Sequence, residues 1–189
     1  MKKLTLLASA LLISAGSFAQ STWSLDKAHT KLGFAVSHMM VSETSGDFKK
    51  YEVKLTAKDE TFVDATIDAT IDVNSINTDQ ADRDAHLKRE DMFDAAKFPT
   101  ITFKSTSFKK VDGKKYKVEG NLTMKGVTKP IVMDVTLMGV IDNPMMKKRD
   151  AGFKFSTIIK RADFGVGNVP AAVVGDEITI AGSMEFFKD

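Results

Sequence analysis

The segment INTDQADRDAHLKREDMFDAAKFPTITF, residues 76–103, carries the helical pattern of this chain. Near its start, Asn77 or Thr78 can cap a helix, because a short side chain with an oxygen atom accepts a hydrogen bond from a free first-turn amide. Asp79 and Asp82 follow, where the positive end of the helix dipole favours negative charge. The segment therefore predicts one short helix that is polar over most of its surface.

Large apolar side chains follow this predicted helix. Leu87 gives it a narrow apolar edge, and Met92, Phe93 and Phe98 come next. Pro99 ends any helical continuation and favours an extended backbone at Phe98. A thin apolar edge followed by three bulky hydrophobic residues is typical of a cover, so we expect this segment to close one end of a larger unit.

The chain on both sides of this segment alternates between apolar and polar residues. Side chains on a strand point to opposite faces in turn, so the pattern predicts antiparallel strands with one buried and one solvated face. The residues predicted to face inward are Leu32, Phe34, Val36, His38 and Met40; Ile67, Ala69, Ile71 and Val73; Ile101 and Phe103; Tyr116, Val118, Leu122 and Met124; Ile131, Met133, Val135, Leu137 and Ile141; Phe153 and Phe155; and Ile178, Ile180, Met184 and Phe186.

Turn residues separate these predicted strands. Asp112-Gly113 predicts a tight hairpin, and Gly126 and Gly175 predict two further turns. Strands at this spacing form a sandwich or a barrel, and composition alone leaves both open. A barrel removes exposed strand edges, and one of about eight strands either fills its interior or holds one small ligand. We therefore favour an all-β antiparallel barrel of about eight strands, with the short helix covering one end.

The first 19 residues have the pattern of a secretory signal peptide. A basic start precedes the apolar run Leu4–Ile13, and Ser17-Phe18-Ala19 supplies small residues for cleavage. The apolar run is shorter than the roughly 20 residues that a membrane-spanning helix needs. We predict cleavage after Ala19, a single mature domain over residues 20–189, and a periplasmic or secreted location.

Charge and cysteine content limit the possible functions. Of 27 Lys and Arg residues two lie in the leader, which has no acid, so 27 − 2 = 25 basic residues face 25 acidic ones in the mature chain. This balance gives no reason to expect a nucleic-acid partner. The chain has no Cys, so its stability must come from packing, and thiol nucleophiles and thiolate metal sites are excluded.

The three histidines offer little chemistry. His38 is in phase with Phe34 and Val36, so it is predicted to point into the barrel, either as a hydrogen-bonded core residue or to meet the polar head of an apolar ligand. His86 is expected to brace the helical cover. Together with His29 they show no metal-ligand spacing, and no nucleophile or phosphate-loop motif occurs, so neither catalytic nor metal-binding residues are predicted.

Several runs in a fixed order resemble one family. They are RDAHL and MFDAAKFPTITFKST around the predicted helix, GNLTMKGVTKP at Gly120–Pro130, AGFKFS at Ala151–Ser156, RADFGV at Arg161–Val166 and VGDEITI at Val174–Ile180. Their order and spacing from about Trp23 to Phe186 resemble the YceI-like family of bacterial secreted proteins. The resemblance implies a lipocalin-like antiparallel barrel that encloses a long apolar ligand of polyisoprenoid or lipid type.

On this basis we expect a binding protein that carries an isoprenoid quinone, a polyprenyl phosphate or a fatty amide, and that needs no cofactor. The residues expected to contact the ligand are Phe34, Val36, His38, Ile71, Met92, Phe93, Phe98, Phe103, Phe153, Phe155 and Met184. An enzyme acting on such a lipid, using His38 with Ser105 or Thr157, is an alternative. A filled barrel with a stress-related structural role is another. Weak membrane contact through Met145-Met146, beside Lys147, Lys148 and Arg149, and self-association both stay open.

Overall fold

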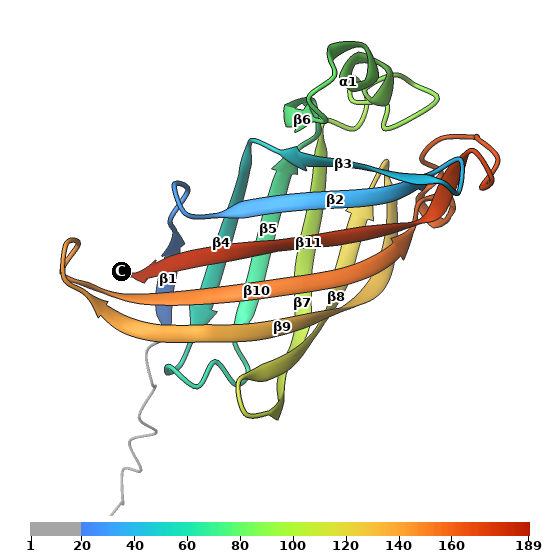
Figure 1. The fold of residues 1–189 in the computed structure, drawn as a ribbon. Helices are drawn as coiled ribbons and strands as arrows, with labels where there is room; N and C mark the ends of the chain where they lie inside the picture. The colour runs from blue at the N-terminus through green and yellow to red at the C-terminus, as the bar shows by residue number, and fades with distance from the viewer. Residues whose placement is uncertain (1–19) are drawn as a thin grey trace, which may run out of the picture.

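A closed antiparallel β-barrel dominates the computed structural model, which describes residues 20–189 (Figure 1). Eight strands close the ring through the pairing of β1 with β11, which confirms the predicted architecture. In ring order they are β1 (Ser21–Leu25), β4 (Tyr51–Ala57), β5 (Thr66–Asp72), β7 (Thr100–Asp112), β8 (Lys115–Met124), β9 (Val127–Asn143), β10 (Lys148–Lys160) and β11 (Val174–Lys188). The predicted signal peptide lies outside the described residues.

Three further strands extend the barrel wall at one end. Strand β11 pairs with β1 near its C-terminus and with β2 (Lys31–His38) from Val174 to Ser183. Strand β3 (Ser42–Phe48) pairs with β2, and the short β6 (Ile76–Asn77) pairs with β3. Two 3-10 helices, Val73–Ser75 and Arg161–Phe164, follow β5 and β10. The wall is therefore longer at this end than the ring of eight strands alone.

Two of the three predicted turns are confirmed. Gly113 (φ 48°) lies in the tight turn between β7 and β8, and Gly126 (φ 76°) lies in the turn between β8 and β9. Gly175 is different, because it lies inside β11, where the register with β2 shifts between Val174 and Ile178. A Cβ atom on Gly175 would lie 2.3 Å from the hydroxyl of Ser37, so this glycine allows close strand approach and the predicted turn is wrong.

The alternation also fails at one position in β9. The register between β9 and β10 shifts beside Gly152, so that Phe153 pairs with Leu137 while Gly152 pairs with Gly139. The extra residue in β9 reverses the facing of everything beyond it. Ile141, predicted to face inward, is 56% exposed for this reason.

An aromatic cluster fills the end of the barrel near the chain termini. The ring centroids of Trp23 and Phe62 are 5.2 Å apart, those of Phe62 and Phe153 5.0 Å, and those of Phe153 and Phe186 6.1 Å. Phe62 is fully buried and Trp23 is 1% exposed. We call Trp23, Phe62, Phe153 and Phe186 the aromatic plug, and the end that they fill is the closed end.

The predicted helix covers the opposite end (Figure 1). It is the seven-residue α1 (Ala81–Leu87), which has no buried residue, in agreement with its polar sequence. Its N-cap is Gln80, whose side chain accepts a hydrogen bond from the Arg83 amide, and not Asn77 or Thr78 as predicted. Thr78 is instead buried and anchors the helix through its side chain, as described below. We call the segment from Ala81 to Phe98 the lid.

Candidate functional site

An apolar cavity of about 210 Å³ runs through the barrel from the lid towards the aromatic plug. Ile101 and Phe108 both line it from β7, and at roughly 3.3 Å per residue the strand between them covers about 20 Å. For comparison, an apolar protein cavity of about 150 Å³ stays dry and binds benzene. The barrel interior therefore contains an apolar chamber.

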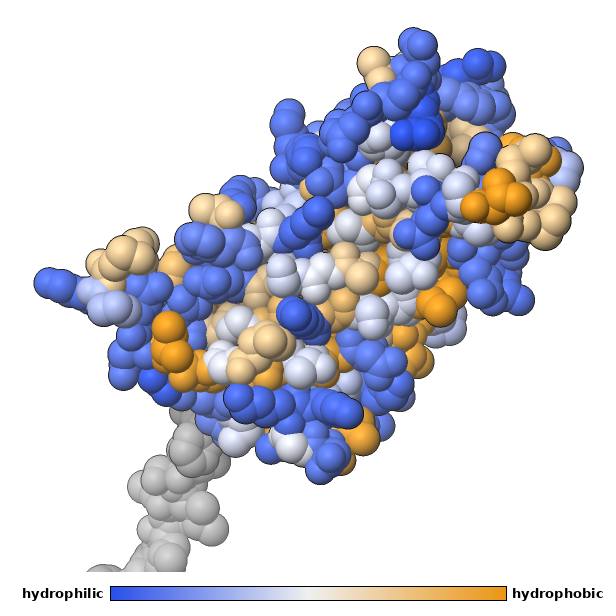
Figure 2. All heavy atoms as spheres, viewed as in Figure 1, coloured by the Kyte–Doolittle hydropathy of each residue, from blue (hydrophilic) through white to orange (hydrophobic). Residues whose placement is uncertain are grey.

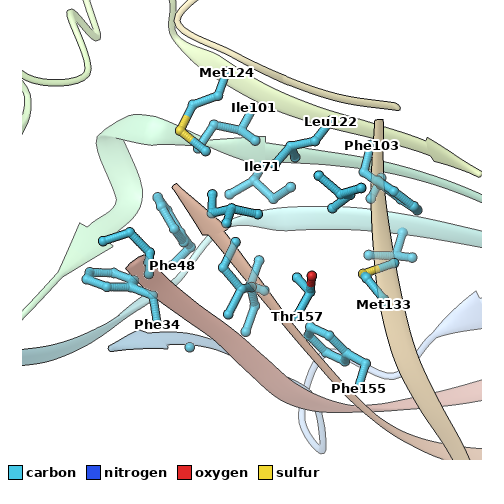
Figure 3. A pocket seen from close by; sticks show the side chains of 18 of the residues that line it. Phe34, Phe48, Ile71, Ile101, Phe103, Leu122, Met124, Met133, Phe155 and Thr157 are labelled. Carbon is cyan, nitrogen blue, oxygen red and sulfur yellow. The ribbon is translucent and has the colours of Figure 1, made fainter. Parts of the chain in front are cut away.

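The chamber wall is almost purely hydrocarbon (Figure 3). Phe34, Phe48 and Phe155 supply aromatic rings from β2, β3 and β10, while Met124 and Met133 supply thioethers from β8 and β9. Among the described residues, the polar side chains in the lining are those of Thr157 and Arg161. The Thr157 hydroxyl donates to the Val132 carbonyl at 2.8 Å, so it has a partner within the wall.

Arg161 organises the loop beside the lid. Its side chain is 7% exposed, and its guanidinium donates five hydrogen bonds to backbone carbonyls. The acceptors are Gly175 (3.0 Å), Val166 (3.3 Å), Gly167 (2.9 Å), Val169 (2.6 Å) and Val174 (3.0 Å). Because all five N–H groups of an arginine are used, this side chain fixes the backbone of residues 166–175 around the chamber rim.

The lid is held to the barrel rim by a polar network around Thr78. The Thr78 amide and hydroxyl both donate to the Asp84 carboxylate, at 2.9 and 2.6 Å. Arg83 donates to the Thr78 hydroxyl and to its carbonyl, each at 2.8 Å. Arg83 and Asp84 are neighbours on α1 whose side chains do not face each other, yet both meet the same threonine.

Apolar and polar contacts close the rest of the lid. Phe93 lines the chamber and packs edge-on against Phe48, with ring centroids 6.5 Å apart. Lys125, in the turn between β8 and β9, donates to the carbonyls of Glu90 and Gly165 at 2.9 and 3.0 Å. This lysine therefore joins the lid to the loop that Arg161 holds.

The two ends of the chamber differ in exposure. At the closed end Phe108 is 2% exposed and Phe186 3%, whereas the lining residues Phe93, Phe34 and Leu87 near the lid are only partly buried. Because the aromatic plug packs the closed end, we expect the chamber mouth at the lid end.

An exposed apolar tip lies beside this mouth. Met39, Met40 and Val41 form the turn between β2 and β3, with exposures of 51%, 77% and 85%. The Met39 amide donates to the Val173 carbonyl at 2.9 Å, which joins the turn to the loop after Arg161. Figure 2 shows apolar side chains gathered at this end of the otherwise largely polar surface. We call Met39–Val41 and Val173 the apolar tip.

Most of the residues predicted from the sequence to contact a ligand do line the chamber. They are Phe34, Val36, Ile71, Met92, Phe93, Phe103, Phe153, Phe155 and Met184.

Arg161 was not predicted as a lining residue, because Lys160-Arg161 looks like surface charge in the sequence. The RADFGV run and the glycines after it were the available signal.

Two of the predicted side chains do not line the chamber. His38 is exposed at the end of β2, because this strand passes beyond the rim and alternation does not show where a strand leaves the barrel. Met40, also predicted to face inward, is in the exposed turn that follows. Phe98 packs outside the chamber, where a Cβ atom on Gly126 would lie 2.7 Å from its ring. Phe98 therefore fixes the outer edge of the lid.

The remaining polar predictions also lie outside the chamber. His86 faces Asp91 at 3.4 Å on the exposed lid surface. Ser105 accepts a hydrogen bond from the Ile67 amide at 2.8 Å and does not line the chamber. The catalytic group predicted for an enzyme, His38 with Ser105 or Thr157, is therefore not assembled around the chamber. Met145 and Met146 are exposed in the turn between β9 and β10. Within residues 20–189, no helix has the length and apolar character needed to cross a bilayer.

Comparison with known proteins gives one family. The model of the YceI-like domain matches residues 23–186. Protein YceI from Salmonella newport is 37% identical over 158 residues, which are 82% of each chain.

Solved structures have the same architecture. The Campylobacter jejuni YCEI protein, 32% identical, has a TM-score of 0.75 and covers 100% of this chain and 99% of its own. Burkholderia cenocepacia BcnA, 28% identical, has a TM-score of 0.76 with 85% and 98% covered. A polyisoprenoid binding domain from Saccharophagus degradans, 16% identical, has a TM-score of 0.63 with 88% and 98% covered, and this likeness concerns the fold.

Proposed function

Because this chain belongs to the YceI-like family, we propose that it is a carrier that holds one long apolar ligand inside its barrel. The observation that carries this proposal is the 210 Å³ chamber with its apolar lining. Burial of a methylene group is worth about 0.8 kcal/mol, so about ten buried carbons supply roughly 8 kcal/mol before the costs of binding. A hydrocarbon chain is held by this wall without any charged anchor.

A polyisoprenoid or another lipid is the ligand class that fits best. The Saccharophagus degradans protein is a polyisoprenoid binding domain, and an isoprenoid chain is a flexible branched hydrocarbon that suits a wall of Phe, Ile and Met side chains. Isoprenoid quinones and polyprenyl phosphates carry such a chain, and fatty amides carry an unbranched hydrocarbon chain. The headgroup would lie at the mouth, where Arg161 and the partly exposed lining residues are found.

The proposed place of action is the periplasm or the exterior of the cell. The signal-peptide pattern of residues 1–19 and the absence of Cys support export. An aqueous compartment offers no apolar phase for a long lipid, so a carrier has to supply one. We expect the apolar tip at the mouth to contact a membrane while the lipid is exchanged. This replaces the sequence-based expectation of membrane contact through Met145-Met146, which lie in a distant turn.

Native mass spectrometry of protein purified from the exporting cell tests the proposal. A single intact lipid per chain, recovered by solvent extraction, supports a carrier. A chemically altered lipid would instead favour the enzyme alternative, and a chain that captures no lipid even from supplied membrane extract would favour the filled barrel. A matched control is the chamber-filling variant Ala69→Phe, which should purify without lipid.

A further inference from the structure

A group of metal-ligating side chains lies at the closed end, on the outer side of the barrel wall. The loop between β1 and β2 lies against β11, where the Asp26 amide donates to the Glu185 carbonyl at 2.8 Å and the Glu185 amide donates to the Thr30 hydroxyl at 3.1 Å. These bonds place the side chains of Asp26, His29 and Glu185 together, with one ligand atom of each within 4.8 Å of the other two. His29 Nδ1 lies 2.8 Å from Asp26 Oδ2.

A third carboxylic acid lies behind this group. Asp150 is 5% exposed, and one of its oxygens accepts a hydrogen bond from the Asn143 amide group at 3.0 Å. Its carboxyl lies beside that of Glu185. Two carboxylates side by side repel each other, and a cation next to them reduces that repulsion.

Lys27 and Arg149, which are next to Asp26 and Asp150 in the sequence, are engaged elsewhere. Lys27 pairs with Glu52, and Arg149 pairs with Glu60 at 2.6 Å and with Asp142 at 3.2 Å. His29 faces the group, and its Nδ1 atom forms a hydrogen bond with the Asp26 carboxylate. Three carboxyl groups therefore face one imidazole, which leaves an excess of negative charge.

We propose that Asp26, His29 and Glu185 form a binding site for a divalent transition-metal ion of the Zn²⁺ type, with the buried Asp150 carboxyl behind it. One imidazole with carboxylate oxygens is a ligand set that Zn²⁺ accepts, whereas Ca²⁺ and Mg²⁺ prefer oxygen alone. Ligand atoms about 2.1 Å from one tetrahedral ion are about 3.4 Å apart, so separations of up to 4.8 Å have to contract by at most about 1.4 Å. The exposed His29 ring is free to make that movement.

The ion would strengthen the seam where the barrel closes. Strands β1 and β11 are joined there through three residue pairs, Trp23 with Lys188, Ser24 with Phe187 and Leu25 with Phe186. Asp26 and His29 directly follow β1, and Glu185 directly precedes the paired part of β11. A shared metal ion would tie these two elements on the outside of the wall. The site is separate from the chamber, so it does not depend on the proposed lipid-carrier function.

Calorimetric titration of the metal-stripped mature chain with Zn²⁺ tests the site. We expect one ion per chain and a binding heat that varies with the ionisation enthalpy of the buffer, because the metal displaces the proton shared by Asp26 and His29. The matched pair of variants is His29→Ala and His86→Ala. Both histidines are exposed and each faces one aspartate, but His86 belongs to the lid.

His29→Ala should weaken Zn²⁺ binding by about tenfold or more, while His86→Ala should leave it unchanged. Zn²⁺ should raise the melting temperature of wild type and His86→Ala but not that of His29→Ala, and Glu185→Gln should behave like His29→Ala. Absence of stoichiometric binding would overturn the proposal. So would equal binding by the two histidine variants, or a site that prefers Ca²⁺ and ignores the loss of His29.

Discussion

Ala69→Phe is expected to block ligand binding while the protein stays folded. Ala69 lies on β5, its methyl group borders the chamber, and it is paired with Phe103 on β7. Empty volume in a protein core costs about 24 cal/mol per Å³, so a 210 Å³ chamber represents roughly 5 kcal/mol of stability that the apo protein lacks. A phenyl ring that fills a third of this space would recover about 1.7 kcal/mol.

The matched control is Ala151→Phe. Ala151 is on β10, is fully buried, and is paired with Phe186 of the aromatic plug. A ring inserted there meets packed atoms, and overpacking costs about 1–3 kcal/mol or more. The same substitution should therefore stabilise the apo protein slightly at position 69 and destabilise it at position 151.

Urea unfolding of the apo proteins and titration with a fluorescent long-chain fatty acid provide the two readouts. Ala69→Phe should weaken binding of the fatty acid by about tenfold or more, equivalent to at least about 1.4 kcal/mol. Ala151→Phe should retain the affinity of whatever fraction is folded. If Ala69→Phe lost as much stability as Ala151→Phe and kept wild-type affinity, the barrel would have a filled core and the ligand would bind elsewhere.

Four further substitutions have distinct expected outcomes. Phe62→Ala should lower the free energy of unfolding in urea by about 3–5 kcal/mol. Phe103→Ala should lower it less and should weaken fatty-acid binding, because the Phe103 ring already borders empty space. Equal losses of stability with unchanged binding would show that Phe103 is an ordinary core residue. Glu185 has a folded-state pKa above its ordinary 4.5, so its contribution to stability is complete below pH 4.5 and is lost as the pH rises through the folded value. Metal-free Glu185→Gln should therefore match wild type near pH 4 and melt higher at pH 8, and a gap that does not change with pH would contradict this reasoning. Asp84→Asn weakens charge-assisted bonds worth about 1.5–3 kcal/mol, so hydrogen exchange should accelerate in the lid but not in the barrel, and a uniform acceleration would disprove a local role.

The barrel was predictable because period-two alternation records which face of a strand is buried. It identified the inward faces of β5, β8, β10 and most of β11 correctly. It failed where geometry changes without a change of composition, as at the extra residue in β9 beside Gly139 and at Gly175 inside β11. Strand β3, SETSGDF, was not predicted, since its pairing with β2 depends on backbone bonds and its side chains are mostly polar or small.

The chamber lining was predictable to the same extent as the strand faces, and the rim was not. His38 is in phase with the inward side chains of β2, but it lies at the end of this strand, beyond the barrel rim. Arg161 is next to a lysine in the sequence, and only the folded loop surrounds it with carbonyl groups. Asp26 and Glu185 are far apart along the chain and meet because ring closure sets β11 beside β1.

The two ends of the barrel differ in the free energy needed to open them, and this difference favours ligand exchange at the lid. Displacing Phe62 or another plug residue exposes a large, fully packed ring, at about 3–5 kcal/mol each. Releasing the lid breaks polar bonds around Thr78 and Lys125, but the freed groups become hydrated when the lid opens, so water offsets most of the energy of each bond. The apolar contact of Phe93 with Phe48 is then regained by the entering lipid chain. A ligand that enters beside the lid therefore replaces the contacts that it breaks, whereas one that enters through the plug does not.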